Sequence, residues 1–238
     1  MKISLVLPTY NRDKERLDRL LTTVEWQAQP FLEVFVVDAS TDPEVQSQNR
    51  KTCGRRAVHL SLSLPEINFP LMYNLGIKHT SSHADYIACT NCDMLFSPNF
   101  TSVMSSLLGD GVEFARSQAA LLPPDANYDD FGTKESWDYL LSISKRKFEL
   151  GHGVLCAPRD WWFHVHGFDE SLSGGLGVFD GDVRKRAHKY GLKLGHTFFE
   201  DAPILHQWHP KSPMKHHNQL KRDDDPPIVK NPSGWGEL

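Results

Sequence analysis

Short apolar runs alternate with amphipathic stretches through the first half of the chain. Apolar runs of this length are typical of strands buried on both faces, and they predict strands over Ile3–Leu7, Val34–Val37, Val58–Leu62 and Tyr86–Cys89. Apolar residues at helical spacing predict helices over Asp13–Gln27, Pro43–Lys51 and Pro70–His79. Strands that alternate with helices in this order predict an α/β fold with a mostly parallel central sheet and helices on both faces.

The second half has a less regular pattern. Leu121–Lys134 is polar, acidic and interrupted by two prolines, so we expect a surface loop there. Helices are expected over Glu135–Leu150 and Asp180–Tyr190, and short strands over Val154–Ala157 and Ala202–Leu205. The glycine-rich stretch Ser173–Gly177 is predicted to be a flexible loop. The polar, proline-rich stretch 211–238 is predicted to be a C-terminal tail and a candidate mobile lid.

Length and charge limit the class of protein. A chain of 238 residues suits one large α/β domain, which we place at 1–210. The formal net charge of -4 argues against a protein that holds nucleic acid by a broad basic surface. No apolar stretch reaches the roughly 18 residues that a membrane span needs. The 12 histidines are an excess that a metal site could explain.

The four cysteines show no regular disulfide spacing. We therefore expect reduced thiols and a cytoplasmic protein, with contact at the inner face of a membrane left open. Cys89 and Cys92 form a C-x-x-C pair, the spacing of some zinc and redox sites. No second pair accompanies them, so small half-buried residues at a strand end are the favoured interpretation.

Polar residues follow three of the predicted strands, at the point where each strand ends. These stretches are Pro8–Arg12, Asp38–Asp42 and Asn91–Asp93. Each alone could be ordinary turn chemistry, since Asp, Asn, Ser and Thr favour turns for local reasons. In open α/β sheets, however, ligands bind beyond the carboxyl ends of the strands. Three such stretches at one edge therefore favour a binding site.

These motifs resemble a known enzyme family. Ser4–Arg12, Val36–Asp42 and Asn74–Ile77 resemble the nucleotide-binding half of the family 2 glycosyltransferases. Gly167–Glu170 and Gly177–Asp182 are similar to that family's acceptor half, and the resemblance runs from residue 2 to about 210. It implies the GT-A fold, with a Rossmann-like sheet, a nucleotide-sugar half at 1–98 and a smaller acceptor and catalytic half at 99–210.

The resemblance implies an inverting enzyme that moves a sugar from a nucleotide-diphosphate sugar, expected to be a UDP-sugar, to a saccharide or lipid-linked glycan. The family holds Mn²⁺ or Mg²⁺ with a D-x-D motif, which aligns with Asn91-Cys92-Asp93. Asp93 keeps the metal-binding carboxylate, whereas Asn91 replaces the first acid. His206, directly at the strand end, is the first candidate for the histidine ligand, and His209 is the second. We do not expect both to bind one metal, because residues three apart on an extended segment point in different directions.

The resemblance also assigns contacts with the donor. Asp38 aligns with the acid that recognises the base, and Ala39 stands where relatives often carry a second acid. Tyr10 could stack on the base and Arg12 could pair with phosphate. The full set of expected donor-binding residues is Pro8, Thr9, Tyr10, Arg12, Asp38, Asn74, Asn91, Cys92 and Asp93.

The general base of the family is the Asp of an E-D-x-D pattern, which aligns here with Phe179-Asp180-Gly181-Asp182. Asp180 is the expected base, although an acid at a helix start is also a common cap. Asp182 is expected to support the helix N-terminus. Trp161 and Trp162 are either an apolar platform for the acceptor or core residues. Phe179 and His209 complete the candidates for acceptor contact.

Two other classes of protein share parts of this pattern. Asn91, Ala39 and Phe179 depart from the family pattern, which leaves open a binding module of the same fold that lacks turnover. A nucleotidyltransferase would normally carry a glycine-rich phosphate loop after the first strand. Pro8–Arg12 contains no glycine, which argues against that class.

Overall fold

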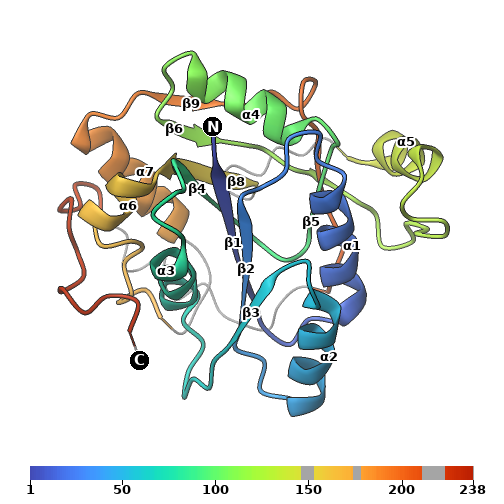
Figure 1. Ribbon diagram of the computed structural model, residues 1–238, viewed down its shortest axis with the longest axis horizontal. Coiled ribbons are helices and arrows are strands. Elements are labelled where there is room, and N and C mark those ends of the chain that lie inside the picture. The colour runs from blue at the N-terminus through green and yellow to red at the C-terminus, as the bar shows by residue number, and fades with distance from the viewer. Residues whose placement is uncertain (146–152, 174–177, 211–222, 238) are drawn as a thin grey trace.

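The computed structural model describes residues 1–145, 153–173, 178–210 and 223–237 (Figure 1). A seven-stranded central sheet has the order β3-β2-β1-β4-β8-β6-β9. Its strands are β1 (Ile3–Thr9), β2 (Glu33–Asp38), β3 (Val58–Ser61), β4 (Tyr86–Thr90), β6 (Phe114–Arg116), β8 (Val154–Pro158) and β9 (Leu194–His196). The first four strands run parallel, whereas β8 is antiparallel to both β4 and β6. The predicted α/β class with a mostly parallel sheet is confirmed.

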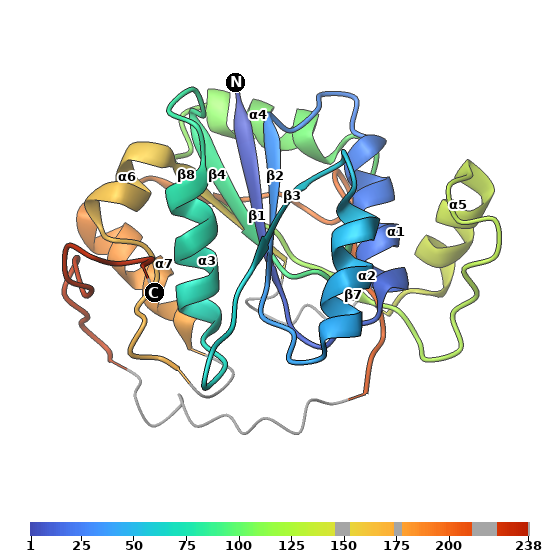
Figure 2. The same ribbon diagram turned by 60° about the horizontal axis from the view of Figure 1, so that its bottom comes forward.

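Helices cover both faces of this sheet (Figure 2). They are α1 (Lys14–Glu25), α2 (Pro43–Cys53), α3 (Phe69–His79), α4 (Phe100–Gly109), α5 (Lys134–Ile143), α6 (Arg159–His164) and α7 (Phe179–Tyr190). Alternate residues of β1 show the division: Leu5 and Leu7 pack with α1 and α4, whereas Val6 packs with α3, α6 and α7. Both apolar layers are therefore buried, as continuous apolar strands require.

Local sequence explains where the early helices begin. Asp13 accepts a hydrogen bond from the Arg16 backbone N–H at 3.0 Å and caps α1. Asn68 accepts one from the Leu71 backbone N–H at 3.0 Å and caps α3. Each cap satisfies a helix N–H that has no partner within the helix.

A second, three-stranded sheet has the order β5-β10-β7, from β5 (Met94–Phe96), β10 (Ile204–His206) and β7 (Ala120–Leu121). The strand expected over Ala202–Leu205 overlaps β10, whereas β5, β6, β7 and β9 are too short to give a clear period in the sequence. The predicted surface loop Leu121–Lys134 begins inside β7. The helix expected over Glu135–Leu150 ends at Ile143 in its described part, and residues 146–150 lie outside the described residues.

The expected tail falls into two parts. Residues 223–237 pack against α7 and α3, and Trp235 is 3% exposed in the core cluster that contains Trp162 and Phe168. This part of the tail is therefore a component of the folded domain. Residues 211–222, with Lys211 and Lys215, lie outside the described residues, as do residues 174–177 of the expected flexible loop.

All four cysteines are free and buried. Cys89 belongs to the core on the α3 side of the sheet and Cys92 to the core on the α1 side. The C-x-x-C spacing therefore reflects two strand-end core residues. In the part of the chain that the structure describes, no helix is long and apolar enough to cross a membrane.

Close packing of α3 against β1 generates a prediction. A Cβ atom on Gly76 would lie 2.3 Å from Cγ1 of Val6. We expect Gly76→Ala to lower the free energy of unfolding by roughly 1–3 kcal/mol, because the helix must move off the sheet. Urea denaturation measures this. Gly109→Ala is the matched control, since nothing lies within 4 Å of its Cβ position, and equal stability of the two variants would contradict the packing argument.

Candidate active site at the carboxyl edge of the sheet

An aspartate and two histidines from distant parts of the chain meet beyond the end of β4. Asp93 lies in the turn between β4 and β5, and β10 pairs antiparallel with β5 so that His206 stands opposite Met94. The Gln207 backbone N–H continues this pairing by donating to the Asp93 carbonyl at 2.8 Å. One ligand atom each of Asp93, His206 and His209 lies within 4.8 Å of the others. The cluster has the size that a divalent cation requires.

The Asp93 carboxylate is buried and held in its charged form. Burial by itself would raise the pKa of Asp93, but the hydrogen bond with His209 and the nearby His206 and Arg12 outweigh it and hold the pKa at about 2. Nε2 of His209 lies 3.2 Å from Oδ2 of Asp93, and Nε2 of His206 lies 3.6 Å from Oδ1. A charged carboxylate between two imidazoles is a ready cation ligand.

One observation tests whether these residues fit a metal. Oδ1 of Asp93 is buried and has no hydrogen-bond partner among the described residues. Buried carboxylate oxygens normally have a hydrogen-bond partner. Because Oδ1 of Asp93 has none among the described residues, its lone pair is available to bind an ion. Carboxylate oxygen with imidazole nitrogen suits Mn²⁺ well, and Mg²⁺ prefers oxygen ligands alone. The set fits the metal that the sequence predicts.

His209 differs from the sequence expectation. We expected its ring to point away from that of His206, but the ring centroids are 5.2 Å apart and both face Asp93. The reason is that the chain leaves the strand geometry after His206, where β10 ends. His209 is therefore a candidate metal ligand rather than a candidate for acceptor contact.

Three arginines from α1 and the residues just before it contact this cluster or the segment that carries its histidines. Nη2 of Arg12 lies 3.8 Å from Oδ2 of Asp93 and 3.3 Å from Nε2 of His209. Arg16 donates to the Trp208 carbonyl at 3.2 Å, and Arg19 donates to Oε1 of Gln207 at 2.7 Å. Sequence reasoning identified Arg12 and missed Arg16 and Arg19. Arg16 and Arg19 lie three residues apart in α1 and so share one helical face, whereas Arg12 precedes the helix.

A second group of residues forms a small pocket beside this cluster. Tyr73, Cys89, Thr90, Asn91, Gly153, Leu155, Phe168 and Asp180 line it. Burial raises the pKa of Asp180 to about 7. The Tyr73 hydroxyl lies 2.9 Å from Oδ1 of Asn91, which orients that amide. Asn91 is two residues before Asp93, so it joins the pocket of Asp180 to the candidate metal cluster.

Asp38 is fully buried and already has partners within the protein. Burial would raise its pKa, but hydrogen bonds with His59, Ser40 and Asn49 lower it overall. Nε2 of His59 lies 3.1 Å from Oδ2, and Asn49 donates to the same oxygen at 2.9 Å. Tyr10 is half-buried against the apolar cluster of Val37 and Ala39. Asp38 therefore anchors the end of β2, and its contact with a base stays a prediction.

Three other residues that were expected to contact the donor use their side chains for contacts within the protein. Asn74 is fully buried and donates to the Phe168 carbonyl at 2.9 Å and to Oε1 of Glu170 at 2.7 Å, which ties α3 to the loop after α6. Pro8 and Cys92 are buried in β1 and in the core. Thr9 is also buried, and its hydroxyl has no hydrogen-bond partner among the described residues.

Of the two interpretations of Trp161 and Trp162, the structure supports core residues and not a platform for the acceptor. Trp161 and Trp162 are 3% and 0% exposed, and the Trp162 indole N–H donates to the Ile87 carbonyl at 3.2 Å. Neither ring offers a face to an acceptor, because both fill the core between α6 and the sheet. Phe179 is half-buried, with its ring centroid 6.2 Å from that of Phe168 and 6.3 Å from that of Tyr73. It stays a candidate for acceptor contact.

Comparison with known proteins identifies the fold. No protein-family model and no curated protein sequence matches the chain. Among solved structures, S. aureus TarS 1–349 in complex with UDP has a TM-score of 0.60 at 16% identity over 88% of this chain and 61% of that chain. GalNAc-T7 with UDP, GalNAc and Mn²⁺ has a TM-score of 0.65 at 12% identity, over 88% of this chain and 44% of that chain. This chain therefore spans less than two thirds of either neighbour, and it has their GT-A fold.

The Asp93 cluster generates a prediction about metal affinity. We expect Asp93→Asn to weaken Mn²⁺ binding at least tenfold, and His206→Ala and His209→Ala to weaken it by roughly ten- to a hundredfold, because each removes one ligand atom. Calorimetric titration with MnCl₂ measures the affinity. His83→Ala is the control, since His83 is exposed and lies outside the cluster. Wild-type affinity in His209→Ala would remove that residue as a ligand.

Proposed function

We propose that the chain is an inverting, metal-dependent glycosyltransferase of the family 2 type. Its donor is a nucleotide-diphosphate sugar, with UDP as the nucleotide, and its acceptor is a saccharide or lipid-linked glycan. The observation that carries the proposal is the Asp93, His206 and His209 cluster beside the pocket that holds Asp180. The GT-A fold supports it, since one solved neighbour is in complex with UDP and another with UDP, GalNAc and Mn²⁺.

In this proposal the residues of the donor side bind the diphosphate. Asp93, His206 and His209 hold Mn²⁺ or Mg²⁺, which when bound acts as a Lewis acid on the departing diphosphate. Arg12 lies against both Asp93 and His209, so its guanidinium is placed to pair with a phosphate oxygen at that position. The Tyr73 hydroxyl holds Asn91 at the boundary between the metal cluster and the pocket.

Asp180 acts as the general base. Its carboxylate takes the proton of the acceptor hydroxyl while that oxygen forms a bond to the anomeric carbon. The bond between the anomeric carbon and the diphosphate oxygen breaks on the opposite face, which inverts the configuration. A base works best when its pKa lies near the working pH, and burial raises the pKa of Asp180 to about 7.

A binding module without turnover is the second candidate. Asp38, the expected contact for the base, is fully buried and accepts hydrogen bonds from within the protein. Asn91 and Phe179 replace two acids of the family pattern. Binding of UDP and Mn²⁺ without turnover of any nucleotide sugar would favour this candidate over the enzyme.

The first prediction for the enzyme concerns Asp180. We expect wild-type protein to turn over at least one member of a panel of nucleotide sugars in the presence of Mn²⁺, and EDTA to stop it. Asp180→Asn should lower kcat by roughly 10²–10⁴-fold, because the amide cannot accept the proton, and should leave the affinity for UDP unchanged. Asp160→Asn is the matched control, because the Asp160 side chain is fully exposed. Unchanged turnover in Asp180→Asn would exclude Asp180 as the base.

The second prediction concerns pH. Only the carboxylate form of Asp180 accepts a proton, and this form predominates above its pKa of about 7. We therefore expect kcat to rise with pH through about 7 and to level off at higher pH. The pH profile of kcat at saturating donor measures this. A profile that is already flat from pH 5 upward would contradict a buried base at this position.

A further inference from the structure

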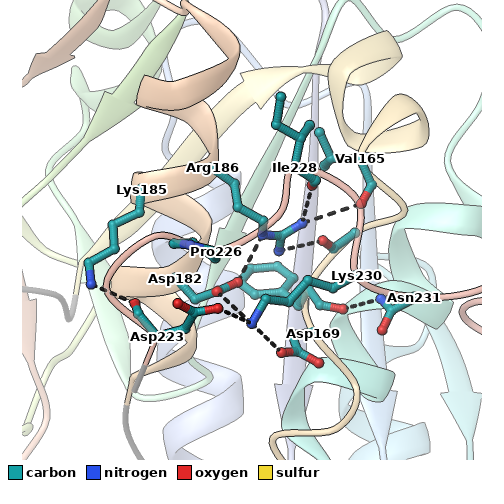
Figure 3. Close-up of polar contacts among 12 residues, drawn as sticks. Val165, Asp169, Asp182, Lys185, Arg186, Asp223, Pro226, Ile228, Lys230 and Asn231 are labelled. Atoms are coloured by element: carbon teal, nitrogen blue, oxygen red, sulfur yellow. Dashed lines mark hydrogen bonds and ion pairs between the residues drawn. The ribbon is translucent and has the colours of Figure 1, made fainter. Parts of the chain in front are cut away.

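The C-terminal residues 223–237 contribute a lysine to a buried ionic cluster next to α7 (Figure 3). Nζ of Lys230 lies 3.0 Å from Oδ2 of Asp169 and 3.4 Å from Oδ1 of Asp182. Nε of Arg186 donates to the other Asp182 oxygen at 2.8 Å. Asp182 therefore receives one cation from its own helix and one from the C-terminal segment.

Four charged groups of this cluster, two of each sign, are largely removed from water, and Lys230 also lies 3.8 Å from Oδ2 of the more exposed Asp223. Arg186 is fully buried, and the side chains of Asp169, Asp182 and Lys230 are 7%, 8% and 15% exposed. Burial would lower the pKa of Lys230, but contacts with Asp169 and Asp182 raise it overall, so the ammonium stays charged. Loss of one partner from a buried ion pair leaves an uncompensated charge and is strongly destabilising.

The first turn of α7 depends on this cluster because it lacks an ordinary cap. Its N-cap residue, Val178, has φ 61° and makes no side-chain capping hydrogen bond. A β-branched residue at positive φ is strained, so local sequence does not favour this helix start. Asp182 lies in that first turn, two residues after Asp180. Lys230 and Arg186 lie outside this first turn and stabilise it through their ion pairs with Asp182.

We propose that Lys230 is a positioning residue that holds Asp180 at its pocket by anchoring Asp182. This inference rests on the proposed function, in which Asp180 is the base. In this proposal, residues 223–237 belong functionally to the acceptor half. Lys230 acts through Asp182 and is not a catalytic residue.

Other contacts keep the segment in place when Lys230 is changed. Nδ2 of Asn231 donates to the carbonyls of His166 and Phe168, and Trp235 is buried against Phe163. Lys189 also pairs with the segment, at 2.8 Å from Asp225, but its side chain is 41% exposed and that of Asp225 86%. Exposed pairs contribute little. Lys189 is thus a matched control on the same helix.

The test compares Lys230→Met, Lys230→Arg and Lys189→Met in transfer assays. We expect Lys230→Met to lower kcat by roughly ten- to a hundredfold with the KM for donor and the affinity for UDP unchanged, because the base is displaced and the donor side is intact. Lys230→Arg should recover part of kcat, and Lys189→Met should match wild type. Added to Asp180→Asn, Lys230→Met should cause no further loss, since both act on one group. Wild-type kcat in Lys230→Met, or full additivity, would overturn the proposal.

Backbone hydrogen exchange gives a measure that does not depend on activity. We expect faster exchange at residues 179–184 in Lys230→Met than in Lys189→Met, with the exchange of β1 and α3 unchanged. Equal protection would overturn the proposal even where kcat falls. If wild-type protein transfers no sugar, the proposed function fails, while the exchange data still decide whether Lys230 anchors the turn.

A charge-balanced variant covers the case in which Lys230→Met does not fold. Asp169→Asn combined with Lys230→Met removes one charge of each sign, so Asp182 and Arg186 remain a neutral pair. We expect this double variant to fold, to show faster exchange at residues 179–184 and to have a lowered kcat. Wild-type exchange and kcat in the folded double variant would overturn the proposal.

Discussion

The candidate site depends on the backbone pairing of β10 with β5. Asp93 is fixed just after β4 by the central sheet, whereas His206 ends β10 and His209 follows it, more than 100 residues later in the chain. The antiparallel register and the Gln207 N–H to Asp93 carbonyl bond bring the two segments to hydrogen-bonding distance. Since each histidine nitrogen must lie a few ångströms from one carboxylate, a shift of a single residue in this register would disperse the cluster.

The surroundings of two carboxylates at this edge shift their pKa values in opposite directions. Asp93 is buried, but it faces His206, His209 and Arg12, which hold its pKa at about 2. Burial raises the pKa of Asp180 to about 7. A permanently charged ligand and a group that exchanges a proton near neutral pH are the two functions that metal-assisted transfer to a hydroxyl needs.

Helix α7 shows how a helix start that local sequence does not favour can be stabilised by distant residues. The chain before α7 adopts a strained conformation at Val178, and no side chain caps the helix. Lys230, Asp169 and Arg186 instead surround Asp182. Phe168 from the loop after α6 and Asp180 from the first turn of α7 line the pocket, and the C-terminal segment contacts that turn through Lys230.

The sequence by itself determined the alternation of strands and helices from β1 to β4 and the polar strand ends, because these depend on local periodicity and local hydrogen bonding. It also indicated Asp93, His206 and Asp180 through the family resemblance. Only the tertiary structure decided that His209 joins Asp93, that Trp161 and Trp162 are core, and that Lys230 reaches Asp182. These outcomes follow from strand register and from the burial of charge, which bring together residues whose separation along the chain carries no periodic signal.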